Sequence, residues 1–205
     1  YLTEQGVVAL NIKGFDSSVE SIHEDYEGNI WFASSRYGVL KLSRSVFGEL
    51  FAEAGEEPAV VNTICLYEGA FYCGTDNGLV IIDRENGDII NNRLTELLTD
   101  ARVRCIKTDS HNNLWICTYS DAGLVKYSSS GGITTFTEKI DGTTSDRFRC
   151  VIELADGTIV AGASNGINFI QEGKVVRTLT QADGLQSPQI LCLQEIICRL
   201  NRRRR

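Results

Sequence analysis

The sequence predicts an all-β fold of repeated four-stranded antiparallel sheets, and three observations support this. A hairpin phrase, in which a polar turn joins two apolar runs, recurs at residues 24–35, 66–75, 109–118 and 154–163. The apolar anchors before successive hairpins lie 42, 42, 45 and 42 residues apart, at Ile22, Ile64, Ile106, Val151 and Leu193. Each period also contains four short strand-like runs. A period of about 40 to 50 residues with four strands per unit is typical of β-propeller blades.

The first complete blade is expected to begin near Val19, after residues 1–18, which we interpret as the end of a preceding partial blade. Its four predicted strands are residues 19–24, 30–33, 39–42 and 46–51. Residues 52–58 are acidic and end in Pro58, which suits a solvated connection.

Three further blades follow the same plan, so that residues 19–189 form four complete blades. Residues 190–198 start another blade, and residues 199–205 are a basic tail. The sequence leaves open whether the partial blades at the two ends join into one composite blade and close a ring.

Aromatic and glycine landmarks are expected to have structural roles. Trp31 and Trp115 should pack between blades, each contributing about 2 to 3 kcal/mol by burial of apolar area. The glycines at the start of each third strand should serve positive φ or close backbone approach; they are Gly38, Gly78, Gly123 and Gly166.

The charge of the chain argues against polyanionic partners. The formal net charge is −7, although five of the 20 basic residues lie in the last seven positions. The body of the chain is therefore more acidic still, and we expect it to bind no nucleic acid. The arginine tail is either a nucleic-acid or acidic-lipid contact or a disordered chain end, and the second interpretation is favoured.

Metal, cofactor and catalytic sites are not expected. The seven cysteines form no C-x-x-C pair, and neither His23 nor His111 stands at a metal-type spacing. Most of the cysteines lie in apolar runs, where a thiol behaves as a small hydrophobic group; their odd number argues against a fully paired disulfide framework. No nucleophile or phosphate-loop context is present, so we predict a protein that is not an enzyme.

Residues 22–32, 106–116 and 180–187 resemble the two-component regulator propeller repeat. The resemblance implies the extracytoplasmic sensor region of a bacterial membrane receptor whose output is a histidine kinase or a diguanylate cyclase. It also implies a ligand, often a carbohydrate. The chain begins at Tyr1 and has no run of 18 apolar residues, so we expect a segment of a longer protein that meets the membrane only through parts absent here.

A ligand site is expected where loops after the second strands meet the starts of the first strands, on one face beside the propeller axis. Aromatic rings beside Asn, Asp and Arg suit a sugar or another small polar ligand. The alternative is that these are ordinary turn residues. The candidate residues are Arg36, Tyr37, Asp76, Asn77, Arg104, Tyr119, Asp121, Arg149, Ser164 and Asn165.

Two functions remain in view. The first is a ligand-sensing propeller segment at the extracytoplasmic face of the bacterial cell membrane. The second is a non-enzymatic scaffold for protein partners or for self-association through open blade edges. A lyase or hydrolase would need a clustered acid and base, and the sequence offers none.

Overall fold

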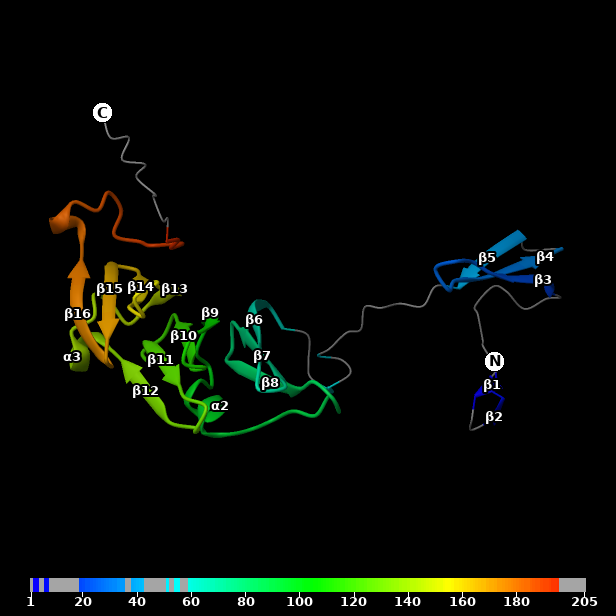
Figure 1. Ribbon diagram of the computed structural model, residues 1–205, viewed down its shortest axis with the longest axis horizontal. Helices are drawn as coiled ribbons and strands as arrows, with labels where there is room; N and C mark the ends of the chain where they lie inside the picture. Colours follow the sequence, from blue (N-terminus) through cyan, green and yellow to red (C-terminus); the bar gives the residue numbers. More distant parts are fainter. Residues whose placement is uncertain are drawn as a thin grey trace, which may run out of the picture. The chain divides into compact units, whose positions relative to one another are not determined.

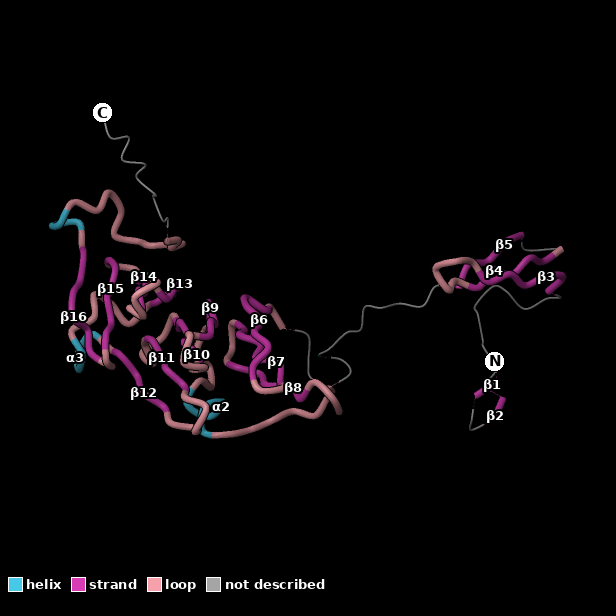
Figure 2. Tube along the Cα trace, viewed as in Figure 1, coloured by secondary structure: helices cyan, strands magenta, loops and turns pink. Residues whose placement is uncertain are grey.

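The computed structural model describes residues 2–3, 6–7, 19–35, 38–42, 51, 54–55 and 59–195 of the chain. The chain divides into two compact units, Tyr1–Glu49 and Leu50–Arg205. Strands dominate both units (Figure 2). The described strands form four antiparallel sheets of three or four strands and one two-stranded sheet, which confirms the predicted all-β fold of propeller blades.

The first unit contains the two-stranded sheet and one three-stranded sheet. Strands β1 (Leu2–Thr3) and β2 (Gly6–Val7) pair with each other. The second sheet has the order β3 (Val19–Glu24), β4 (Ile30–Ser34) and β5 (Gly38–Leu42). The fourth strand predicted for this blade, residues 46–51, lies outside the described residues except for Phe51, and the predicted basic tail at 199–205 lies wholly outside them.

The second unit contains three sheets in chain order (Figure 1). The first comprises β6 (Val61–Tyr67), β7 (Ala70–Thr75) and β8 (Leu79–Asp83). The second comprises β9 (Val103–Thr108), β10 (Leu114–Thr118), β11 (Leu124–Tyr127) and β12 (Ile133–Phe136). The third comprises β13 (Phe148–Glu153), β14 (Ile159–Ala163), β15 (Gly166–Gln171) and β16 (Lys174–Leu179).

Two apolar clusters join these three sheets. One combines side chains of β6–β8 with side chains of β9–β11, and it includes the fully buried Ile116. The other combines β9–β12 with β13–β15 around Phe136 and Phe148. Each sheet therefore buries one face against the next, as the blade prediction requires.

The second blade departs from the predicted four-strand plan. After β8, only an isolated antiparallel bridge pairs Ile89 with Ile82, and the chain then enters helix α2 (Arg93–Leu97). Asn92 caps this helix by accepting hydrogen bonds from the backbone N–H groups of its first turn. Leu94 and Leu98 are fully buried, so the helix contributes apolar area to the core in place of a strand. The remaining short helices are α3 (Glu138–Asp141) and the 3-10 turn η1 (Gln181–Asp183).

The hairpin turns repeat one hydrogen-bond pattern. Between β9 and β10, Asp109 accepts hydrogen bonds from the backbone N–H of Asn113 at 2.8 Å and from the indole Nε1 of Trp115 at 2.8 Å. Between β3 and β4, Asp25 accepts the equivalent bonds from Asn29 at 3.0 Å and from Trp31 at 2.8 Å. The Asp25 carboxylate thus organises its turn through hydrogen bonds within the hairpin.

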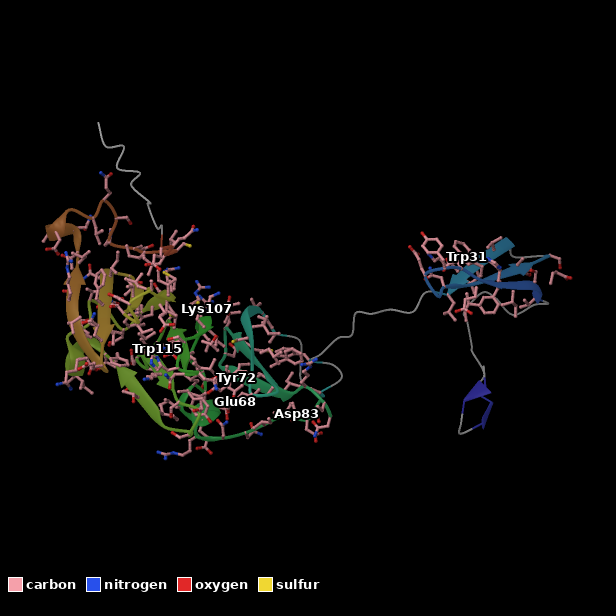
Figure 3. All side chains as sticks on the ribbon, viewed as in Figure 1. Trp31, Glu68, Tyr72, Asp83, Lys107 and Trp115 are labelled. Atoms are coloured by element: carbon pink, nitrogen blue, oxygen red, sulfur yellow. The ribbon has the colours of Figure 1, made fainter. Side chains whose placement is uncertain are left out.

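The landmark residues in the second unit have the expected structural roles. Trp115, labelled in Figure 3, is only 3% exposed and belongs to the cluster shared with the next sheet. Its ring stacks on Phe136. Gly123 and Gly166 have φ values of 69° and 136°, and a Cβ atom there would collide with the carbonyl oxygens of Phe136 and Leu179. Only glycine meets both demands at these positions.

Candidate functional site

The candidate site is framed by a backbone contact that recurs in three blades. In each blade of the second unit, the residue after the second strand donates its backbone N–H to the carbonyl of the residue just before the first strand. The three pairs are Asp76 to Val60 at 3.3 Å, Tyr119 to Arg102 at 2.7 Å and Ser164 to Arg147 at 2.9 Å. This contact brings the loop residues and the starts of the first strands to one end of each sheet.

Tyr119 lies at the centre of the site, and three arginines surround its ring. The guanidinium Cζ atoms of Arg149, Arg147 and Arg104 lie 4.9, 5.2 and 6.0 Å from the ring centroid. Arg104 comes from β9, and Arg149 from β13 of the next blade. The cluster therefore spans the junction of two blades.

A second part of the site surrounds Asp76. Its carboxylate accepts a hydrogen bond from Asn62 Nδ2 at 2.8 Å and forms a salt bridge with Arg102 Nη2 at 2.7 Å. Asn62 also accepts a long hydrogen bond of 3.5 Å from Arg104. A continuous polar network thus runs from Asp76 through Asn62 and Arg104 to Tyr119.

The surroundings of Asp76 and of Tyr119 lower the pKa of both side chains. The Asn62 amide and the Arg102 guanidinium lower the pKa of Asp76 from its usual value. The nearby Ser164 hydroxyl, followed by Arg149 and Arg147, lowers the pKa of Tyr119. The two guanidinium groups contribute to this lowering because a positive charge nearby favours the ionised phenol.

The structure brings together five of the ten residues predicted from the sequence. These five are Asp76, Arg104, Tyr119, Arg149 and Ser164. Three others are exposed turn residues whose side chains have no hydrogen bond or ring contact in the described part of the chain: Asn77, Asp121 and Asn165. Arg36 and Tyr37 lie outside the described residues.

Sequence reasoning missed Asn62, Arg102 and Arg147. A signal for the two arginines exists, because an Arg-x-Arg-Cys phrase opens two successive first strands, at residues 102–105 and 147–150. Residues two apart in a strand point to the same face, so such a phrase places two arginines on one side of the strand start.

A hollow of about 900 Å³ lies at the opposite end of the sheets. It is lined by the turns after β9, β13 and β15 and by Trp115. The Lys126 ammonium lies 5.6 Å from the Trp115 ring centroid, and Ser110 donates two hydrogen bonds to Glu153. Glu153 and Lys126 of its lining are therefore already engaged by other side chains, and we rank this hollow below the Tyr119 cluster, where three arginines converge on one ring.

Two further observations concern the described residues alone. They contain no group of three or more His, Cys, Asp or Glu side chains placed to hold a metal ion. None of their helices has the length and apolar character needed to cross a membrane.

Comparisons with known proteins bear on both sequence and fold. The family model described as "Two component regulator propeller" matches residues 13–36 and 97–120. A search of curated proteins found no match. Two structures of an extracellular domain from B. thetaiotaomicron, described as a hybrid two-component or one-component system, match with TM-scores of 0.50 and 0.51 at 22% and 24% identity.

These alignments cover 76% and 78% of this chain but only 20% and 22% of those domains, so the chain spans about a fifth of their length. PorZ, a surface component of the type-IX secretion system of Porphyromonas gingivalis, matches with a TM-score of 0.51 at 18% identity, over 82% of this chain and 28% of PorZ. At these identities the likeness concerns the fold. The chain thus has a fold of propeller blades, and its residues 13–36 and 97–120 are similar to the two component regulator propeller repeat.

Proposed function

We propose that this chain is a ligand-sensing segment of the propeller of a bacterial membrane signalling receptor, and that it binds a small polar or carbohydrate ligand at the Tyr119 cluster. The observation that carries the proposal is the convergence of Tyr119, Arg104 and Arg149 from two blades on one end of the sheets. Recognition of a polar ligand needs a few convergent hydrogen-bonding groups on a rigid frame, and strand ends supply such a frame.

The family supports the signalling role and the extracytoplasmic location. Its repeats match twice in the chain, and the B. thetaiotaomicron structures are extracellular domains of signalling systems. On this basis we place the segment outside the cytoplasmic membrane, within a longer receptor that supplies the output domain. We also propose a non-enzymatic role, because the carboxylate described at the site, that of Asp76, is bound by Asn62 and Arg102 and is not paired with a second acid or base.

The arginines around the Tyr119 ring determine how a ligand can contact the site. Because three guanidinium groups already lie within about 6 Å of the Tyr119 centroid, we expect the ligand to meet their N–H groups and the phenol rather than to stack on the ring. The phenol and the guanidinium groups then act as hydrogen-bond partners for hydroxyl or charged oxygens.

The proposal is tested by calorimetric titration of the chain with a panel of neutral and acidic disaccharides, followed by Tyr119→Ala. This substitution removes both a hydrogen-bonding group and the ring that holds the arginines, so affinity should fall at least about tenfold. Tyr26→Ala is the matched control, because Tyr26 is 97% exposed in the first unit. Equal affinity of the two variants would contradict the assigned site.

Self-association is a second candidate function, and one observation favours it. Within the second unit, β6 exposes 57% of Ile64 and 49% of Leu66, two residues apart on the same side of the strand. Exposed apolar side chains on the first strand of a blade form a surface that a sheet of a second copy of the chain can cover.

A further inference from the structure

The three arginines around Tyr119 have no partner anion among the described residues. Arg102 forms a salt bridge with Asp76, but no described carboxylate lies within salt-bridge distance of Arg104, Arg147 or Arg149. Three unpaired guanidinium groups consequently surround one ring, at 4.9 to 6.0 Å from its centroid. Like charges this close repel one another, and an anion among them removes that repulsion.

Unused hydrogen-bonding capacity accompanies this charge. The Nε atom of Arg149 is buried and has no hydrogen-bond partner among the described residues. The Ser164 hydroxyl oxygen beside Tyr119 is likewise buried and lacks a hydrogen bond of good geometry. Buried polar atoms are nearly always paired, so two unpaired ones at a positively charged cluster mark the place of a missing acceptor.

We propose that the Tyr119 cluster recognises an oxyanion, the carboxylate or sulfate group of an acidic carbohydrate. This inference rests on the proposed function and narrows its ligand class. Guanidinium groups bind planar or tetrahedral oxyanions through paired N–H donors, which lysine cannot do. Arg104 and Arg149 come from adjacent blades, so one oxyanion bound between them would also link the two blades.

The charge of the rest of the chain limits the size of the ligand. The net charge is −7, so the arginine cluster is a small positive region on an acidic protein. A long polyanion would meet repulsion beyond the cluster, whereas a sugar with one or two charges would not. The acidic surroundings therefore favour a short acidic oligosaccharide over a nucleic acid as the ligand.

The experiment compares matched sugars on the 205-residue chain by isothermal titration calorimetry. Digalacturonate and its neutral counterpart galactobiose differ in charge, as do sulfated and unsulfated forms of one disaccharide; inorganic sulfate and phosphate serve as anions without a sugar. The acidic sugars should bind at least about tenfold more tightly than the neutral ones, and the difference should shrink as salt is added.

Variants then locate the site. Arg147→Gln and Arg149→Gln should each weaken binding of the acidic sugar about tenfold to a hundredfold, the range for hydrogen bonds to charged groups. Arg149→Lys keeps the charge but loses the paired donors, so it should restore only part of the affinity. Arg84→Gln, at an exposed position after β8, is the matched control and should leave binding unchanged. Thermal unfolding of each variant shows whether it is folded, and Arg147, which is exposed, provides the variant least coupled to folding.

The outcomes separate this inference from the function on which it rests. Neutral sugars that bind as tightly as acidic ones, in a manner dependent on Tyr119, would overturn the inference and leave the sensing role intact. Inorganic sulfate or phosphate that matches the acidic sugars would keep the oxyanion site and overturn the carbohydrate part of the proposed function. Binding insensitive to the arginine variants would overturn the site, and absence of binding by every probe would overturn both proposals.

Discussion

Asp25 and Asp109 occupy the same position in two hairpins, and each carboxylate holds its turn together through the following Asn and Trp. Trp31 and Asn29 hold the pKa of Asp25 well below its usual range. Burial raises the pKa of Asp109, but the hydrogen bonds from Asn113 and Trp115 outweigh burial, and the resulting pKa is lower than the usual value. The folded hairpins therefore stabilise the ionised carboxylates of Asp25 and Asp109.

The pH dependence of stability should follow from Asp109. A lowered pKa in the folded state stabilises the protein fully above the unfolded value of 3.8 and loses this contribution as the pH falls through the folded value. Asp109→Asn should reduce the free energy of unfolding at neutral pH by about 1–2 kcal/mol, because the amide cannot accept from both Asn113 and Trp115. Denaturant unfolding at pH 7, 4 and 2.5 measures this.

The difference in free energy of unfolding between wild type and Asp109→Asn should become smaller from pH 7 to pH 2.5, because the wild-type carboxylate becomes protonated. Asp88→Asn is the control for removal of a negative charge, because Asp88 is exposed and its side chain has no hydrogen bond within the described part of the chain. A gap that stays constant from pH 7 to 2.5 would refute the role assigned to the carboxylate.

At the scale of elements, hairpins were predictable from the sequence and the second-blade helix was not. A hairpin depends on neighbouring residues, so its turn chemistry and alternation are visible in a short window. The predicted run at residues 154–163 indeed spans the turn between β13 and β14. Helix α2 has only five residues and is held by the burial of Leu94 and Leu98, a tertiary contact that periodicity over one turn cannot reveal.

The cap of α2 offers a test of that helix. Asn92 accepts hydrogen bonds from Leu94 and Thr95, and the Thr95 hydroxyl accepts one from the Asn92 backbone N–H. Asn92→Ala should lower the free energy of unfolding by about 1 kcal/mol, the usual cost of losing a helix N-cap. Asn91→Ala, next to it but exposed and without a side-chain hydrogen bond in the described residues, should change stability far less. Equal losses in a urea titration would contradict the capping role.

For the whole molecule, the sequence predicted five residues of the candidate site but missed two of its four arginines. Landmark glycines and strand ends predicted that Asp76, Arg104, Tyr119, Arg149 and Ser164 share one face, because equivalent positions of successive blades emerge together. Arg102 and Arg147 were missed because their role depends on backbone pairing with the loop of the same blade, through the carbonyls that Tyr119 and Ser164 contact. Such pairing is a property of the assembled sheet.

Association of whole molecules is tested by measuring molar mass in solution over a range of concentrations. If β6 pairs copies of the chain, mass should rise with concentration, and Ile64→Asp should reduce association by placing a charge in the apolar contact. Ile140→Asp is a matched control, because Ile140 is 79% exposed in α3, on another blade. A monomer at all concentrations would contradict the self-association hypothesis and leave the ligand site unaffected.

The hydrogen bond from each loop N–H to the carbonyl before the first strand uses main-chain atoms only. Asp76, Tyr119 and Ser164 are chemically unrelated, yet the three blades hold them in the same way. Exchange of these side chains would leave the supporting framework in place. Substitutions at these three equivalent loop positions can therefore give new ligand specificities, in evolution or by protein engineering. The architecture of the blades does not have to change for this.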